Sequence, residues 1–491
     1  MTVHDWNDLV SRLSPRLAPL RVRVYGSGGA PYHHLALAAL FGADARPISA
    51  DAIREGGLAT ADVFVVPGGG TRAMSGLLEP LGTAGAAAVR TFVANGGMYV
   101  GSCAGSFLPA VVGESFWTEN PQARHMCMVN AQVFNSGDSE WAGLTSPGVG
   151  TVHVTTERPR HWLAAGLPPH FRLVHYNGPM FTATPGAAPQ PDRVAGTAVT
   201  DVTGVVSFTA ATRDFTPGEA FLGAPHQGRT LFEKGAAEGA FTAVAGAFGE
   251  GTVVLFGSHP EFGLDTVQLG WDDGVRLFGN ALAHQSSAPR GPGGAPAPRG
   301  PGTLDTRSSG TTSALAEAAS LARDNAARFD MLAATDPGDW ARPGAVAGFL
   351  GLEPRELWRR AAHDAAVASH ATDAYLRGLA DVDPSDQPAG VEAWLHARPP
   401  DGQDYGFAGL LPLLRRVGAM VEAARASLSD RPFTLQGPYD AMEHHPYQVG
   451  LSSYLSAAGL AASGLLCAVT IGRVLGDRTA LPSEHLLAAL R

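Results

Sequence analysis

Cysteine, lysine and charge are scarce in this sequence of 491 residues. The three cysteines, Cys103, Cys127 and Cys467, are spread along the chain, and this sparse, odd number leaves no disulfide framework and fits a reduced compartment. Charged residues make up only 16% of the chain, Lys234 is the single lysine, and the formal net charge is -10. Because there is no long basic run either, we expect no nucleic-acid partner.

Signals for export or membrane insertion are also weak. The first residues lack the basic stretch followed by an apolar one that is typical of a secretory signal. An uncharged segment at residues 449–471 has the length of a membrane span, but it contains serines, a tyrosine and many small residues. That composition favours a buried bundle helix, with a membrane span as the alternative. We therefore expect a cytoplasmic protein that does not cross a membrane.

Proline and glycine, by contrast, are abundant, and one run divides the chain. Residues 286–312 consist mainly of Pro, Gly, Ala, Ser and Arg, a composition that cannot bury a core. We predict that this run is a linker between two domains, residues 1–285 and residues 313–491.

The first domain alternates short β-branched runs with apolar helical stretches. Strands are predicted at residues 21–25, before a glycine turn, at 62–66, before Pro67 and three glycines, and at 98–100. This β-α-β rhythm predicts an α/β fold, a mostly parallel sheet with helices on both faces. The sequence further predicts helices at 31–40, 86–94 and 267–283, and strands at 151–155, 205–209 and 252–256.

The second domain has helical spacing and few strand signals, which predicts a separate all-α bundle. Its apolar stripes are expected to form a core, or a surface for a second copy of the chain or a partner enzyme. The helices are predicted at 314–332, 354–379, 410–428 and 448–475.

The most informative stretch is residues 97–109, GMYVGSCAGSFLP. A short apolar strand enters a turn centred on Cys103, between Gly101 and Gly105, and an apolar helix follows, as in a nucleophile elbow. The helix N-terminus favours a thiolate there, and the amide of Ala104 is left pointing at any oxyanion that forms. A buried structural cysteine is the alternative, but the G-x-C-x-G context favours a nucleophile.

A base for this thiol is available at the end of another strand. In residues 251–262, GTVVLFGSHPEF, a single proline separates His259 from Glu261 and restrains the backbone between them. Such a loop can direct the imidazole toward Cys103 and the carboxylate toward the imidazole. An isolated His-x-Glu would indicate a surface loop, but combined with the elbow it predicts a Cys-His-Glu triad.

Five segments of the first domain carry a family resemblance. They are VYGSGGAP (24–31), VVPGGG (65–70), GSCAGSFLP (101–109), HYNGPMF (175–181) and GSHPEF (257–262). In these segments residues 20–285 resemble the class I glutamine amidotransferases, and more closely the family of the biotin–protein ligase N-terminal domain. The resemblance covers a little over half the chain and implies a flavodoxin-like α/β domain.

Position by position, the resemblance also implies roles for individual residues. The triad would consist of the nucleophile Cys103, the general base His259 and its orienting partner Glu261. The backbone amides of the oxyanion hole would come from Gly69, Gly70 and Ala104. The substrate pocket would be lined by Tyr176, Asn177, Phe107 and Ser27.

The sequence departs from the glutamine-using pattern in one position of the elbow. Where G-x-C-x-G-x-Q enzymes have a glutamine that helps hold the substrate, this chain has Phe107, whose ring cannot make those hydrogen bonds. No acceptor domain, ATP-activating loop or biotin-ligase signature is recognisable. We therefore expect no cofactor, and a small amide or acyl compound as substrate rather than necessarily glutamine.

Other features have plainer interpretations. The glycines of residues 26–29 lack the G-x-G-x-x-G spacing of a dinucleotide fingerprint, so a tight turn is expected. His33 and His34 stand at the start of a predicted helix, where they either face the pocket, are exposed to solvent or cap the helix. Cys127 is expected in the core, with a resolving thiol as the alternative.

Histidines of the second domain do not form a metal pattern. His363 and His370 lie seven residues apart on a predicted helix, about 10.5 Å of helix rise, which is too far to share one ion easily. A further pair stands at residues 444–445. We expect no metal site.

Two functions from different classes remain open. One is a Cys-His-Glu hydrolase or amidotransferase-like enzyme that cleaves a C–N bond through a thioester intermediate. The other is a ligand-binding or regulatory module that keeps the fold without turnover. The intact triad favours the enzyme.

Overall fold

The computed structural model describes residues 3–29, 31–68, 73–140, 148–183, 199–212, 225–261, 273–287, 308–335, 354–379 and 409–427. It also describes residues 142, 216–217, 391, 395–396, 461, 464–465, 467–468 and 471–472.

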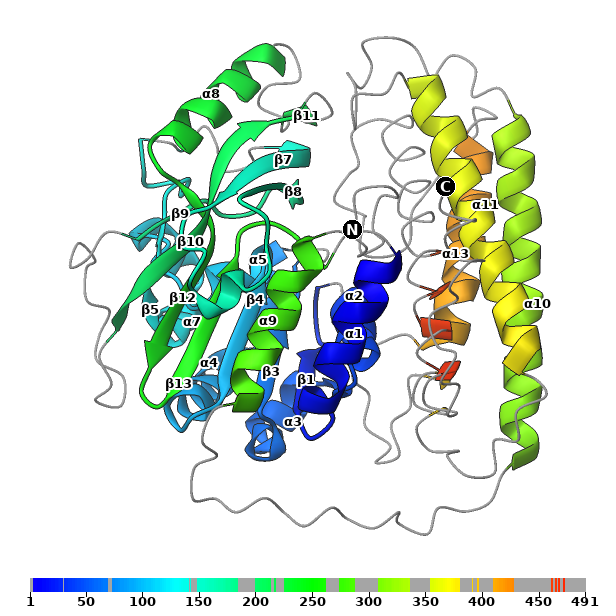
Figure 1. Ribbon diagram of the computed structural model, residues 1–491, viewed down its shortest axis with the longest axis horizontal. Coiled ribbons are helices and arrows are strands. Elements are labelled where there is room, and N and C mark those ends of the chain that lie inside the picture. Colours follow the sequence, from blue (N-terminus) through cyan, green and yellow to red (C-terminus); the bar gives the residue numbers. More distant parts are fainter. Residues whose placement is uncertain are drawn as a thin grey trace.

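The α/β domain is built on a mixed sheet whose main path runs β11-β7-β10-β12-β13-β4-β3-β1-β2 (Figure 1). One half is parallel and consists of β2 (Asp44–Ile48), β1 (Arg21–Tyr25), β3 (Val63–Val66), β4 (Met98–Ser102) and β13 (Gly251–Phe256). The other half is antiparallel and consists of β12 (Phe241–Phe248), β10 (Thr200–Ala211), β7 (Gly148–Thr156), β8 (His170–Tyr176) and β11 (Thr216–Pro217). Three short strands complete the sheets: β5 (Val129–Asn130), β6 (Gln132–Val133) and β9 (Phe181–Thr182).

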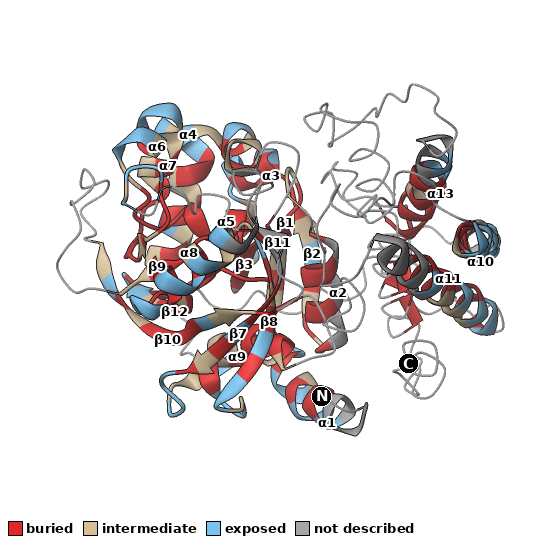
Figure 2. Cartoon of the chain, turned by 90° about the horizontal axis from the view of Figure 1, so that it is seen from above, coloured by how far each residue is buried: buried red, intermediate tan, exposed pale blue. Residues whose placement is uncertain are grey.

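Helices cover both faces of the parallel half, as the sequence predicted. Figure 2 shows α3 (Ala50–Arg54), α4 (Ala73–Ala94) and α7 (Pro121–Met126) on one face, and α1 (Val3–Leu17) and α9 (Gly274–Ser287) on the other. All residues of β3 and β4 are buried, which is why these strands are uniformly apolar or small instead of alternating. The other helices are α2 (Tyr32–Leu40), α5 (Ala104–Phe107), α6 (Glu114–Glu119), α8 (Pro225–Ala237), and the short 3₁₀ helices η1 (Gly57–Thr60) and η3 (Trp162–Ala164).

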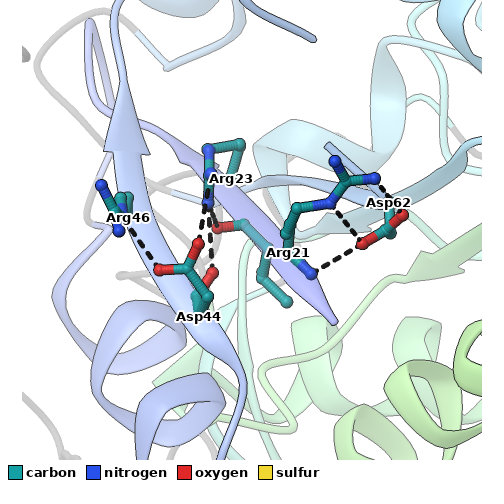
Figure 3. A network of polar contacts seen from close by, with 6 residues as sticks. Arg21, Arg23, Asp44, Arg46 and Asp62 are labelled. Carbon is teal, nitrogen blue, oxygen red and sulfur yellow. Dashed lines mark hydrogen bonds and ion pairs between the residues drawn. The ribbon is translucent and has the colours of Figure 1, made fainter. Parts of the chain in front are cut away.

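Arginine–aspartate pairs bind β1 to its neighbours near the amino end of the strand (Figure 3). Arg21 binds Asp62 through two side-chain nitrogens, at 2.7 and 3.0 Å, and its backbone N–H donates to the same carboxylate at 2.8 Å. Arg23 and Arg46 both bind Asp44, at 3.3 and 2.8 Å. Because these contacts lie near the amino ends of the strands, they leave the carboxyl ends open for a site.

The C-terminal region is helical, also as predicted. Helix α10 (Ser308–Ala334) packs along α11 (Pro354–Leu379) and α13 (Leu410–Ser427). The interface contains a buried amide, Asn325, whose Nδ2 donates to the carbonyl of Leu414 at 2.8 Å. Within the described ranges no helix is both long and apolar enough to cross a membrane.

The helices extend into both ends of the run assigned to the linker. Helix α9 continues through Ser287, and α10 already begins at Ser308. Most of residues 449–471 lie outside the described part of the chain, so the bundle-helix interpretation of that segment stays a prediction.

Candidate functional site

The predicted triad lies at the carboxyl edge of the parallel strands. In the register of the sheet, Val66 of β3 pairs with Gly101 of β4, and Phe256 of β13 pairs with Ser102. The segments that follow these three adjacent strands therefore start side by side, and they contain Gly68, Cys103 and His259. Open α/β sheets bind their ligands at this edge.

The backbone at Cys103 is strained. Its φ of 47° and ψ of -115° lie outside the regions that L-residues prefer, and among the described non-glycine residues only Asn177 shares a positive φ. The N–H of Cys103 donates to the carbonyl of Phe256 at 2.8 Å, and the hydroxyl of Tyr99 donates to the carbonyl of Gly105 at 2.6 Å. These bonds hold the sharp strand-to-helix turn that a nucleophile elbow requires.

Glycines make this turn possible. A Cβ added at Gly105 would lie 2.2 Å from the carbonyl oxygen of Val66, so only glycine permits the close approach of α5 to the end of β3. A Cβ at Gly68 would lie 2.6 Å from Cβ of Cys103 and 2.9 Å from Cε1 of His259. Cys103 and His259 thus both border the backbone of Gly68.

Of the three residues predicted to form the oxyanion hole, Ala104 lies within the described part of the chain. Ala104 is the first residue of α5, so its N–H belongs to the group of helix amides that have no carbonyl one turn earlier. It directly follows Cys103, as an oxyanion-hole donor at an elbow does. Gly69 and Gly70 lie outside the described residues, so their predicted role stays a prediction.

His259 is held by one contact of its backbone and one of its imidazole ring. Its backbone N–H donates to the carbonyl of Val174 in β8 at 2.8 Å, and its Nδ1 lies 2.7 Å from Oε1 of Glu261. A proton on Nδ1 makes this contact a hydrogen bond to the carboxylate and leaves Nε2 for the thiol. Both side chains are buried, with 4% of His259 and 2% of Glu261 exposed.

The charges of the site favour an imidazolium. Burial lowers the pKa of His259, but the carboxylate of Glu261 and the sulfur of Cys103, both of which it contacts, outweigh burial and raise this pKa to about 10. Burial raises the pKa of Glu261, but His34 and His259 together bring it down to about 2. The pair is therefore ionised over the physiological pH range, and a positive imidazolium stabilises a neighbouring thiolate.

Tyr176 and Asn177 border the nucleophile at the end of β8. The thiol of Cys103 donates to the backbone carbonyl of Tyr176 at 3.2 Å, and the Tyr176 ring is 44% exposed and stands edge-on to His259, with centroids 6.5 Å apart. Asn177 uses its side-chain oxygen to accept the N–H of Gly148 at 2.9 Å. In this structure, therefore, Tyr176 lies beside the reactive groups, whereas the amide oxygen of Asn177 is engaged in holding the turn.

The other two predicted pocket residues have different surroundings. Phe107 lies on α5 with only 8% of its surface exposed and belongs to the hydrophobic core. The hydroxyl of Ser27 accepts the N–H of Ala50, at 2.8 Å, at the start of α3. The structure brings Cys103, His259 and Glu261 together, but it gives Ser27 a structural contact.

Two buried histidines near the triad did not emerge clearly from the sequence. His34 is fully buried, and its Nε2 lies 2.9 Å from Oγ of Ser102 and 3.5 Å from Oε2 of Glu261. His175 is also fully buried, its Nδ1 lies 3.1 Å from Oγ of Ser258, and burial lowers its pKa to about 3. The available signal for His34 was its place in an apolar helix directly after a glycine turn.

The remaining candidates are structural. Cys127 and Cys467 are fully buried, and burial raises the pKa of each thiol to about 12, so neither is a ready nucleophile. His363 and His370 are exposed on α11, and His370 binds Asp330 at 2.9 Å. In the described part of the chain no three His, Cys, Asp or Glu side chains gather as metal ligands, and residues 444–445 lie outside it.

Comparisons with known proteins find remote likenesses among solved structures only. No protein-family model and no curated protein sequence matches the chain. Among solved structures, a protein from Thermoplasma acidophilum described as a candidate subunit of GMP synthase shares 13% identity at a TM-score of 0.33, covering 55% of this chain and 94% of its own. A cytoplasmic protein from Salmonella typhimurium shares 13% identity at a TM-score of 0.30, and the match covers 54% of this chain and 98% of that protein. A ThuA-like protein from Bacteroides uniformis shares 12% identity at a TM-score of 0.27, and the match covers 54% of this chain and 90% of that protein.

These likenesses are too remote to place the chain in a family or to support an argument about its fold. They show no membership of the biotin–protein ligase N-terminal family. At such identities and TM-scores the likeness carries no information on chemistry, so the assignment of the site depends on its own geometry.

Proposed function

We propose that the protein is a cysteine-nucleophile hydrolase or amidotransferase-like enzyme that cleaves the C–N bond of a small amide or acyl compound. The observation that carries this proposal is the juxtaposition of a strained Cys103, a buried His259 and an ionised Glu261 at the carboxyl edge of the sheet. A purely structural cysteine needs neither the strain nor the buried ion pair, whereas a nucleophile uses both.

The chemistry follows from the positions of these groups. In the resting ion pair Nε2 of the His259 imidazolium already holds the proton of the thiol, and the thiolate of Cys103 attacks the substrate carbonyl to form a tetrahedral oxyanion beside the N–H of Ala104. The imidazolium then gives its proton to the leaving amine, and a thioester remains. Water, deprotonated by the same imidazole, attacks the thioester and releases the acid and the free thiol. Glu261 keeps its proton state and orients the ring throughout.

The substrate class rests on Phe107 and on the proposed chemistry of Cys103. A phenyl ring replaces the amide that glutamine-using enzymes carry in the elbow helix, which speaks against free glutamine as substrate. The proposed attack of Cys103 on an amide-type carbonyl favours a small amide or related acyl compound instead. We further propose that the protein acts in the cytoplasm and that the helical region contacts a second copy or a partner enzyme.

Alkylation of the full-length protein with iodoacetamide tests the proposal. We expect Cys103 to react at pH 6 at least about tenfold faster in the wild type than in His259→Ala, because loss of the imidazolium removes the stabilisation of the thiolate. Peptide mapping by mass spectrometry between pH 5 and 9 gives the rate at each cysteine.

Cys127 and Cys467 are internal controls in the same chain. Both are buried, with the pKa of each thiol raised to about 12, and are expected to stay unlabelled in both proteins. Equal rates at Cys103 in wild type and His259→Ala would contradict the proposed nucleophile–base pair.

One observation favours the alternative, a binding or regulatory module. The hydrogen bond from the Cys103 thiol to the carbonyl of Tyr176 requires a protonated sulfur, and that carbonyl oxygen would oppose a thiolate. A module that only binds a ligand would keep this bond, so its Cys103 would react no faster than an ordinary thiol at any pH between 5 and 9.

A further inference from the structure

His34 comes from a different part of the fold than the triad, yet it reaches two of the segments that build the site. It lies on α2, the helix after β1, and none of its surface is exposed. Its Nε2 lies 2.9 Å from Oγ of Ser102, the residue before the nucleophile, and 3.5 Å from Oε2 of Glu261. The edge of its ring packs against Phe278 of α9, with centroids 5.3 Å apart.

The carboxylate of Glu261 explains why such a neighbour matters. Its Oε1 binds Nδ1 of His259, whereas its buried Oε2 accepts no hydrogen bond from the described residues. A buried anion that lacks donors is costly. Within the same ranges no arginine or lysine forms an ion pair with Glu261, so its charged and titratable neighbours there are His259 and His34.

The protonation state of His34 follows from what surrounds it. Burial lowers its pKa more strongly than the nearby carboxylate raises it, so the ring is neutral. A lone pair on Nε2 would face the Glu261 carboxylate and be repelled by it, which places the single proton on Nε2. Nδ1 then carries the lone pair, and in the described structure this atom accepts no hydrogen bond.

A neutral donor suits this position better than a cation would. An arginine or lysine beside Oε2 would hold the carboxylate but would also cancel the charge that keeps His259 protonated. A neutral N–H restrains the carboxylate and leaves its charge to His259.

We propose that His34 is a positioning residue that holds the second oxygen of Glu261 and so keeps the carboxylate aligned with His259. This inference rests on the proposed function, because alignment of His259 matters only if that imidazole serves Cys103. It adds a fourth member, contributed by α2, to the arrangement of Cys103, His259 and Glu261.

Substitution of His34 tests the proposal with a matched pair of variants. His34→Gln keeps an N–H close to the position of Nε2, whereas His34→Leu keeps the bulk and removes the donor. We expect the alkylation rate of Cys103 at pH 6 to fall about tenfold in His34→Leu, because the N–H that lies 3.5 Å from Oε2 is lost, and to recover substantially in His34→Gln.

A second readout does not depend on the reactivity of Cys103. A proton shared by Nδ1 of His259 and Glu261 gives a downfield ¹H NMR resonance in the full-length protein. We expect it in the wild type and in His34→Gln, and expect it to weaken or shift upfield in His34→Leu. If the wild-type Cys103 proves unreactive, the proposed function fails, and this resonance still decides the role of His34.

Two further variants separate positioning from packing. Ser102→Ala removes the other partner of His34 and keeps the contact with Glu261, so its resonance should remain. His370→Gln alters an exposed histidine on α11 and is the control for an unspecific effect of replacing a histidine by glutamine. If His34→Leu does not fold, His34→Asn replaces it, because the shorter amide cannot reach Glu261.

The proposal is overturned by either of two results. Wild-type rate and resonance in His34→Leu would show that Glu261 needs no second donor. Equal impairment of His34→Leu and His34→Gln, in folded proteins, would show that an N–H at this position is not what holds Glu261.

Discussion

Gly68→Ala is expected to slow the alkylation of Cys103 at pH 6 by about a hundredfold while the protein remains folded. The added methyl group would lie 2.6 Å from Cβ of Cys103 and 2.9 Å from Cε1 of His259, well inside van der Waals contact. Either side chain must move to accept it, and a displacement of about 1 Å between reacting groups can cost about 10²-fold. Alkylation kinetics with iodoacetamide, followed by peptide mapping, measure the effect.

Gly137→Ala is a matched control within the same domain. Its added Cβ would meet nothing closer than Oγ of Ser115 at 4.0 Å, and like Gly68 it does not have a positive φ. Near-UV circular dichroism of both variants reports whether the domain keeps its packing. A folded Gly68→Ala that reacts at the wild-type rate would show that the nucleophile and the base do not meet across this backbone.

Elements with strong local patterns were predicted well. The strands at residues 21–25 and 252–256 agree with β1 and β13 to within one residue, and the helix at 354–379 agrees with α11 at both ends. In both strands the apolar residues that the pattern selects as buried pack in the core, so local sequence and tertiary structure favour the same element.

Other elements could not be recognised from local pattern. Strand β2 reads Asp-Ala-Arg-Pro-Ile, and it exists because it pairs with β1 at the edge of the sheet and because Arg23 and Arg46 bind Asp44. Proline is tolerated there because an edge strand has one side free of ladder hydrogen bonds. Strand β12 contains mainly alanine, glycine and phenylalanine, and its place between β10 and β13 defines it more than its propensity does.

The candidate site shows the same division. Cys103, His259 and Glu261 lie in two short motifs whose spacing already implies their roles, and the structure brings them together at the ends of neighbouring strands. His34 lies almost seventy residues before the elbow, at a sequence separation of 68 from Ser102, and belongs to no motif. Only the parallel order of β1, β3, β4 and β13 makes it a neighbour of Glu261, and that order is a tertiary property.

Gly105→Ala is expected to lower the free energy of unfolding of the α/β domain by at least about 3 kcal/mol, a value at the upper end for overpacking. The added Cβ would lie 2.2 Å from the carbonyl oxygen of Val66 and 2.9 Å from that of Pro67. Both are backbone atoms at the end of β3, which is bonded to strands on each side, so they cannot turn away as the tip of a side chain would.

Denaturant unfolding followed by tryptophan fluorescence measures this loss, with Trp117, which is 3% exposed, as a reporter inside the α/β domain. Gly137→Ala should change the same transition by no more than about 0.5 kcal/mol, as surface substitutions do. Unchanged stability in Gly105→Ala would mean that α5 does not approach β3 this closely. The close approach of Gly105 to the end of β3, together with the hydrogen bond from Tyr99, would then no longer account for the strained backbone at Cys103.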